Sequence, residues 1–173
     1  MIITVENLKK QVACGNATDD LIATKLEGIE EVIRAYTHNN FQIRAVRYAG
    51  RSDGSCVYGD PRFFVAGDTV QISQSGVNDG LYVVKVVADD HLELDKPLMA
   101  VEFNLVTKVQ YPADVVQCAV DLFKWKQTMG DKVGVKSETL SRHSVTYEDS
   151  GTLFMGYPVG ILNGLNLHQK ARC

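Results

Sequence analysis

The sequence predicts an α+β protein in which a small helical bundle core is interrupted by an antiparallel β-barrel-like insert. Apolar residues recur with helical spacing near both ends of the 173-residue chain, whereas the middle has short apolar runs separated by turn residues. We therefore expect residues 1–40 to pack against residues 110–173 as one discontinuous core, with residues 41–109 folding as the insert. A chain of this length can bury such a core without metal or disulfide support.

Two helices are predicted before residue 40. Thr4 is a suitable N-cap for a short helix over residues 5–12, and Thr18 caps a longer helix that begins with two aspartates. The longer helix has an apolar stripe with alternating spacings of four and three residues, which is typical of a helix buried on one side. The stripe consists of Ile22, Leu26, Ile29, Ile33 and Tyr36. We expect Asn39 and Asn40 to end this helix.

The strand pattern belongs to the insert. Residues 50–59 are rich in glycine and serine and are predicted to form a loop. Candidate strands follow at residues 63–65, 69–73, 81–87, 91–94 and 101–109. In the last of these, four apolar residues alternate with polar ones, which predicts a half-buried strand with the apolar residues on its buried face. These four are Val101, Phe103, Leu105 and Val109. Short strands joined by tight turns favour a small barrel or curled sheet.

The helical pattern returns after Pro112, a residue suited to the first turn of a helix, and stops at Met129 and Gly130. The predicted buried face comprises Val116, Ala119, Val120 and Phe123, widened by Leu122 and Trp125. Residues 132–147 are polar, with hydroxyl residues interleaved, and we expect an extended segment there. Pro158 then opens a short last helix with four apolar residues, which are Ile161, Leu162, Leu165 and Leu167.

We find no constellation of residues that indicates catalysis. The four cysteines are far apart, the histidines lack metal-ligand spacing, and no phosphate-binding or nucleophile motif occurs. Asp89, Asp90 and His91 are better explained as a hairpin turn, because adjacent residues on a strand point to opposite faces. We therefore expect a non-enzymatic protein without a metal or cofactor.

Charge and hydropathy argue against nucleic acids and membranes as the main binding partners. The formal charge of −3 gives no general electrostatic case for binding nucleic acid or an anionic membrane. No apolar run is long enough to span a membrane, and the N-terminus lacks the pattern of a signal peptide. We expect a protein that is made in the cytoplasm and does not bind membranes.

Three stretches share the order and spacing of one protein family. They are residues 4–10 (TVENLKK) with the acidic-capped helix of residues 19–36, residues 111–116 (YPADVV) leading into 122–125 (LFKW), and residues 134–140 (GVKSETL) with 144–147 (SVTY). In this arrangement the chain resembles the head–tail connector (adaptor) proteins of tailed bacteriophages and prophages. The match covers more than half of the chain, and the insert is the departure from the family, whose small members have a much shorter link there.

The resemblance implies a subunit of a homo-oligomeric ring of about a dozen copies, a closed cyclic assembly in the virion neck. Such a ring docks beneath the portal protein, has a stopper or tail-completion protein below it and continues the DNA channel. Passing DNA would be contacted only transiently and without sequence specificity, since tight binding needs many phosphate-neutralising cations.

The resemblance also assigns roles to two segments. Residues 132–147 correspond to the lumen or inter-subunit strand, with Lys132, Lys136, Ser137, Glu138, Arg142 and Tyr147 as its site residues. Residues 158–173 correspond to a portal-docking tail with Ile161, Leu162, Leu165, Leu167, Lys170 and Arg172. The tail combines glycines with apolar anchors, which favours a segment that folds on binding. The alternative is a C-terminal helix that simply covers its own domain.

Two other functions remain open from the sequence. The chain could be another neck or tail-completion protein, such as a stopper or a terminator. The insert could also bind a small molecule or carbohydrate through Tyr58, Phe63, Phe64 and Tyr82, although we expect these aromatic residues to belong to the core.

Overall fold

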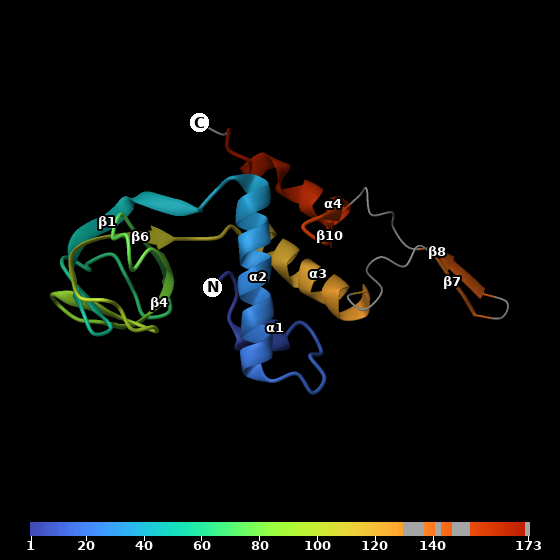
Figure 1. Ribbon diagram of the computed structural model, residues 1–173, viewed down its shortest axis with the longest axis horizontal. Coiled ribbons are helices and arrows are strands. Elements are labelled where there is room, and N and C mark those ends of the chain that lie inside the picture. Colours follow the sequence, from blue (N-terminus) through green and yellow to red (C-terminus); the bar gives the residue numbers. More distant parts are fainter. Residues whose placement is uncertain (130–136, 141–142, 147–152, 172–173) are drawn as a thin grey trace. The chain divides into compact units, whose positions relative to one another are not determined.

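The computed structural model describes residues 1–129, 137–140, 143–146 and 153–171 (Figure 1). The protein is α+β, and six antiparallel strands form a closed barrel. The chain divides into two compact units. The barrel unit comprises Met1 and Asn40–Tyr111, and the helical unit comprises Ile2–Asn39 and Pro112–Cys173. In the part of the chain that is described, no helix combines the length and apolar character needed to cross a lipid bilayer.

Six strands of the barrel unit enclose one apolar interior. They are β1 (Gln42–Asp53), β2 (Cys56–Tyr58), β3 (Thr69–Ser73), β4 (Gly80–Val87), β5 (His91–Leu94) and β6 (Val101–Val109). Their order around the barrel is β1-β2-β5-β4-β3-β6, and pairing of β1 with β6 closes it. The interior is filled by Val57, Phe64, Val70, Ile72, Val84, Leu92, Leu94, Leu98 and Val106. The predicted bounds of β3, β5 and β6 are confirmed.

The prediction that residues 50–59 form a loop was wrong, because β1 continues to Asp53 and β2 follows. Val46 and Tyr48 of β1 pack against the core, while Arg47 between them is exposed. The arginines that interrupt the apolar pattern of β1 in the sequence therefore lie on the outer face of the strand. Gly50 allows the backbone of β1 to approach its neighbour, since a Cβ there would lie 1.6 Å from the carbonyl oxygen of Tyr58.

Two further predictions about the insert need correction. Residues 63–65 form no strand, and only Phe64 among them is buried, whereas Phe63 is 69% exposed. On β6 the predicted buried face is confirmed at Val109, which is 4% exposed, but wrong further along: Asn104 and Val106 are fully buried and Phe103 is 48% exposed. The barrel interior accommodates Asn104 because its side-chain amide is hydrogen-bonded, so an apolar–polar alternation does not identify the inner face there.

The helical unit contains helices that come from both ends of the chain. They are α1 (Val5–Lys9), α2 (Asp19–Thr37), α3 (Ala113–Met129), α4 (Val159–Leu162) and the 3-10 helix η3 (Asn163–His168). Helix α2 packs against α3 (Figure 1). Two small antiparallel pairs complete the described elements: β7 (Ser137–Leu140) with β8 (His143–Thr146), and β9 (Leu153–Phe154) with β10 (Tyr157–Pro158).

Helix α2 begins where the sequence predicts. The Thr18 side chain accepts a hydrogen bond from the backbone nitrogen of Leu21, and the helix ends at Thr37 because His38 adopts the left-handed conformation. Four residues of the predicted stripe are fully buried, namely Ile22, Leu26, Ile29 and Ile33. Glu30 is also buried, which the pattern did not indicate, and it accepts a hydrogen bond from the backbone nitrogen of Ile2 at 3.1 Å.

The buried face of α3 is close to the predicted one. Its buried residues are Val115, Cys118, Ala119, Val120, Leu122 and Phe123. Val116 is half-buried, so the centre of the face is rotated towards Val115. This wide face is typical of a helix that packs against more than one neighbour, and α3 contacts α2, α4 and η3.

Candidate functional site

The segment expected to line a lumen contains the paired strands β7 and β8. Ser137 pairs with Thr146 and Leu140 with His143 in an antiparallel register. The predicted extended conformation is therefore confirmed for these strands, which pair with each other. In the two-stranded sheet that they form, each strand uses one edge, and its other edge carries backbone groups that another strand could pair with.

Only part of the predicted lumen site can be placed. Ser137 and Glu138 lie on β7. Four other candidates lie outside the described residues, and these are Lys132, Lys136, Arg142 and Tyr147.

The C-terminal tail differs from the prediction at its apolar residues. Leu162 and Leu165 are fully buried in the helical unit, where α4 and η3 pack against α3. The expectation that a closed core does not need these residues is wrong for Leu162 and Leu165, because they form part of that core. The docking role of the tail stays a prediction. Ile161 is half-buried, and its carbonyl oxygen accepts a weak hydrogen bond from the Cys118 thiol at 3.7 Å.

Polar contacts fix the tail to the end of α2. The Tyr36 hydroxyl lies 3.1 Å from Oδ1 of Asn163 and 2.9 Å from Oδ1 of Asn166. Beyond η3, the backbone nitrogen of Lys170 donates a hydrogen bond to the carbonyl oxygen of Thr37 at 2.9 Å. These contacts connect parts of the chain far apart in sequence, so the segment is ordered by its own unit.

A second polar contact joins the tail to the first turn of α3. Nε2 of His168 lies 2.6 Å from Oδ2 of Asp114, whose other oxygen accepts a hydrogen bond from the backbone nitrogen of Val115. The hydrogen bond from His168 lowers the pKa of the Asp114 carboxyl, and the bond from Val115 adds to this. No local pattern indicates this pair, since the two residues lie 54 positions apart in the sequence.

What remains exposed on the tail is a smaller surface than predicted. Leu167 is 94% exposed, and Lys170, three residues later in the sequence, is also exposed. Arg172 lies outside the described residues. An almost fully exposed leucine on a segment held by buried neighbours is a candidate anchor for a partner.

Titratable and metal-ligating side chains can be located within the described part of the chain. No group of three or more His, Cys, Asp and Glu side chains there could hold a metal ion. Asp90 and His91 do meet, contrary to the prediction, because Asp90 precedes β5; its Oδ1 lies 2.7 Å from Nδ1 of His91. Burial raises the pKa of the Cys118 thiol to about 11, so this thiol is protonated at neutral pH.

The four aromatic residues considered for ligand binding do not form one surface. All four were expected to belong to the core. This is confirmed for Phe64, which lies in the barrel core, and for Tyr82, which packs against that core. Tyr58 instead lies beside His91, with ring centroids 5.4 Å apart, and Phe63 is exposed on the loop between β2 and β3. These placements do not favour a carbohydrate site built from the four rings.

Comparison with known proteins adds no family assignment. Neither a protein-family model nor a curated protein matches the chain.

Proposed function

We propose that the protein is a non-enzymatic structural subunit of a bacteriophage head–tail connector ring. The ring would dock beneath the portal protein, contact a stopper or tail-completion protein below and continue the DNA channel through the neck of the virion. The helical unit would serve as the small helical bundle core of the connector, and the barrel would be an addition to it.

One observation carries the proposal. The described parts of the stretches that resemble connector proteins include residues of helices α1, α2 and α3 and of the paired strands β7 and β8. All of these elements belong to the helical unit, and none belongs to the barrel. A resemblance whose helices and strands all belong to one compact unit is what a connector core with an inserted barrel requires.

Two features of the helical unit suit assembly. The free edges of β7 and β8 could pair with a strand of a neighbouring subunit, and main-chain pairing of this kind is a common mode of association. Leu167 and, three residues later, Lys170 offer an exposed apolar side chain and an exposed positive charge, suited to an acidic groove on the portal. The formal charge of −3 suits a channel wall that does not retain DNA.

The test is assembly on the portal ring of the same phage. Purified protein is mixed with portal rings, and the particles are sized by gel filtration and viewed by electron microscopy. We expect a second ring bound to one end of the portal, with Leu167→Asp abolishing binding and Leu21→Asp, an exposed leucine on α2, leaving it intact. A protein that ignores the portal but caps tail tubes would instead be a terminator, and the proposal would be wrong.

A further inference from the structure

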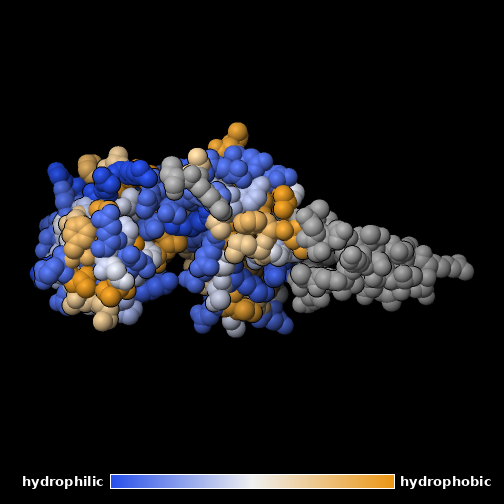
Figure 2. All heavy atoms as spheres, turned by 45° about the horizontal axis from the view of Figure 1, so that its top comes forward, coloured by the Kyte–Doolittle hydropathy of each residue, from blue (hydrophilic) through white to orange (hydrophobic). Residues whose placement is uncertain are grey.

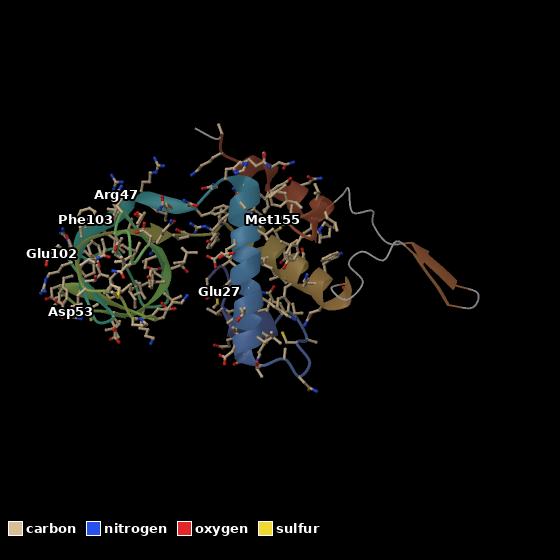
Figure 3. The ribbon with its side chains drawn as sticks, in the orientation of Figure 1. Glu27, Arg47, Asp53, Glu102, Phe103 and Met155 are labelled. Carbon is tan, nitrogen blue, oxygen red and sulfur yellow. The ribbon has the colours of Figure 1, made fainter. Side chains whose placement is uncertain are left out.

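The outer side of the barrel carries a strip of residues whose two ends have opposite charge. On β1 the exposed outward positions are Arg47, Ala49, Arg51 and Asp53, which alternate with Tyr48, Gly50 and Ser52. Ala49 pairs with Leu105 of β6, and Phe103 and Glu102 follow along that strand. Figure 3 shows Arg47, Phe103, Glu102 and Asp53 following one another along the outer side of the barrel.

The apolar middle of the strip is exposed without being part of a loop. Phe103 is 48% exposed although it lies within a nine-residue strand. The register between β1 and β6 shifts between Gly50 and Ser52, so β6 has an extra residue opposite Arg51. This bulge explains why Glu102 and Phe103, although adjacent, are both exposed. In the view of Figure 2, the barrel surface likewise shows apolar patches among hydrophilic side chains.

The charged ends of the strip are available for an intermolecular contact. Within the described residues, Arg47, Asp53 and Glu102 form no ion pair. The neighbouring Arg51 is engaged differently, since its guanidinium carbon lies 4.4 Å from the centroid of the Tyr58 ring. Arg51 is thereby directed towards β2, and Arg47 remains as the positive end of the strip.

We propose that the strip is a self-complementary surface that binds a second copy of this chain around a two-fold axis. In such a contact the same patch is used on both subunits, and the positive end of one strip meets the negative end of the other. The two Phe103 side chains then cover each other near the axis. In a head-to-tail contact, only one positive end would meet one negative end, and the Phe103 side chains in the middle of the strips would stay exposed.

This contact goes beyond the connector function and does not depend on it. A two-fold contact closes after two copies, whereas a ring needs a heterologous contact that repeats. The barrel contact would therefore hold free subunits as pairs before a ring forms. The strip lies on the barrel, which is the departure from the connector family, so the inference is specific to this barrel.

The experiment is sedimentation velocity of the full chain without portal protein. A strip this narrow lies at the small end of specific interfaces, so we expect a monomer–dimer equilibrium within about 1–100 µM protein. Raising the salt concentration from about 0.1 M to 0.5 M should weaken the dimer, because its charged ends are exposed. A chain that remains monomeric throughout this range overturns the proposal.

Charge reversal tests the geometry of the pair. Arg47→Glu and the double variant Asp53→Lys/Glu102→Lys should each weaken dimerisation at least about tenfold, since every substitution acts twice across the two-fold axis. Mixing the two variants should restore pairing as a heterodimer, because one strip then has two negative ends and the other two positive ends. Lys85→Glu, at an exposed site on β4, is the matched control.

Mixing the two charge-reversal variants distinguishes a specific two-fold contact from a general effect of net charge on association. Heterodimers of the two variants, together with an unchanged dimer in Lys85→Glu, support the two-fold strip. Variants that fail to pair when mixed, or a Lys85→Glu protein as weak as Arg47→Glu, overturn it. Neither outcome bears on ring formation, which is measured with portal present.

Discussion

The side-chain nitrogen of Asn78 donates a hydrogen bond to Oδ1 of Asn104 inside the barrel, with 3.0 Å between the two atoms. Asn78 also accepts a hydrogen bond from the backbone nitrogen of Met99 at 2.8 Å, and Asn104 donates to the carbonyl oxygen of Gly50 at 3.1 Å. The two amides thus join β1, β6 and the loops before β4 and β6. A buried network of this kind fixes a unique arrangement only when each member is satisfied.

Replacing Asn78 with alanine should destabilise the barrel unit by about 2–4 kcal/mol, because partners in the interior lose their hydrogen bonds without gaining water. Urea unfolding of the full chain, followed by the near-ultraviolet signal, measures the effect. Asn16→Ala, at an exposed position before α2, serves as the control and should leave the transition unchanged. Equal stabilities of the two variants would mean that the network adds nothing to the fold.

Ile29→Asp should unfold the helical unit, since Ile29 is fully buried on the face of α2 and an unpaired carboxylate there costs several kcal/mol. Circular dichroism at 222 nm reports the loss of helix. Leu21→Asp places the same charge on the same helix at a half-exposed position, and we expect its helix content to match the unchanged protein. Retention of the melting temperature in Ile29→Asp would contradict the packing of α2.

The tail offers a pair of matched leucines three and five residues beyond α4. Leu165→Ala should cost about 2–5 kcal/mol because it leaves a cavity in the core, whereas Leu167→Ala should change stability by less than about 0.5 kcal/mol. Thermal unfolding distinguishes the two. The same argument predicts that truncation after Tyr157 destabilises the helical unit, in contrast to a tail needed only for docking.

The contact between His168 and Asp114 should make stability depend on pH at the acid end. The pKa of Asp114 is lowered below its ordinary value of 3.8 in the folded protein, so the contribution of this carboxyl is present above that pH. It is lost as the pH falls through the lower folded-state pKa. The difference in melting temperature between the unchanged protein and Asp114→Asn should therefore shrink as the pH falls from about 6 to about 2.5.

The control for this titration is Asp89→Asn, which removes an exposed carboxyl outside the contact. His168→Gln should reproduce the loss seen in Asp114→Asn. If the stability difference stays constant over the acid range, the hydrogen bond does not affect the titration of Asp114.

The elements predicted correctly are those in which the spacing of apolar residues agrees with the capping and turn residues at the ends. Helix α2 has both an N-cap at Thr18 and a stripe with helical spacing, and its core residues followed directly. Strand β1 was missed because exposed arginines on its outer face break the apolar pattern, while its inner face uses Gly50 and Ser52. Local periodicity cannot identify a strand whose inner positions are small or polar.

The sequence identified the segments of the candidate site but not which of their residues are exposed. Leu165 and Leu167 look equivalent in the sequence. Only the packing of η3 against α3 shows that Leu165 is a core residue and Leu167 an exposed one. The hydrogen bonds of Tyr36 and of His168 join segments distant in the chain, for which the sequence has no local signal. The inward position of Asn104 likewise depends on partners that other strands supply.

The barrel begins and ends at neighbouring points, since the backbone nitrogen of Gln110 donates to the carbonyl oxygen of Phe41 at 3.0 Å and the rings of Phe41 and Tyr111 lie 5.0 Å apart. In an unfolded chain, a loop of roughly 70 residues separates the two halves of the helical unit, and each doubling of loop length adds about 0.6 kcal/mol to the entropic cost of closure. A barrel that folds first shortens this loop to a few residues and removes about 3 kcal/mol of that cost. The insert thus favours an order of folding in which β-structure forms early and the two helical halves meet afterwards.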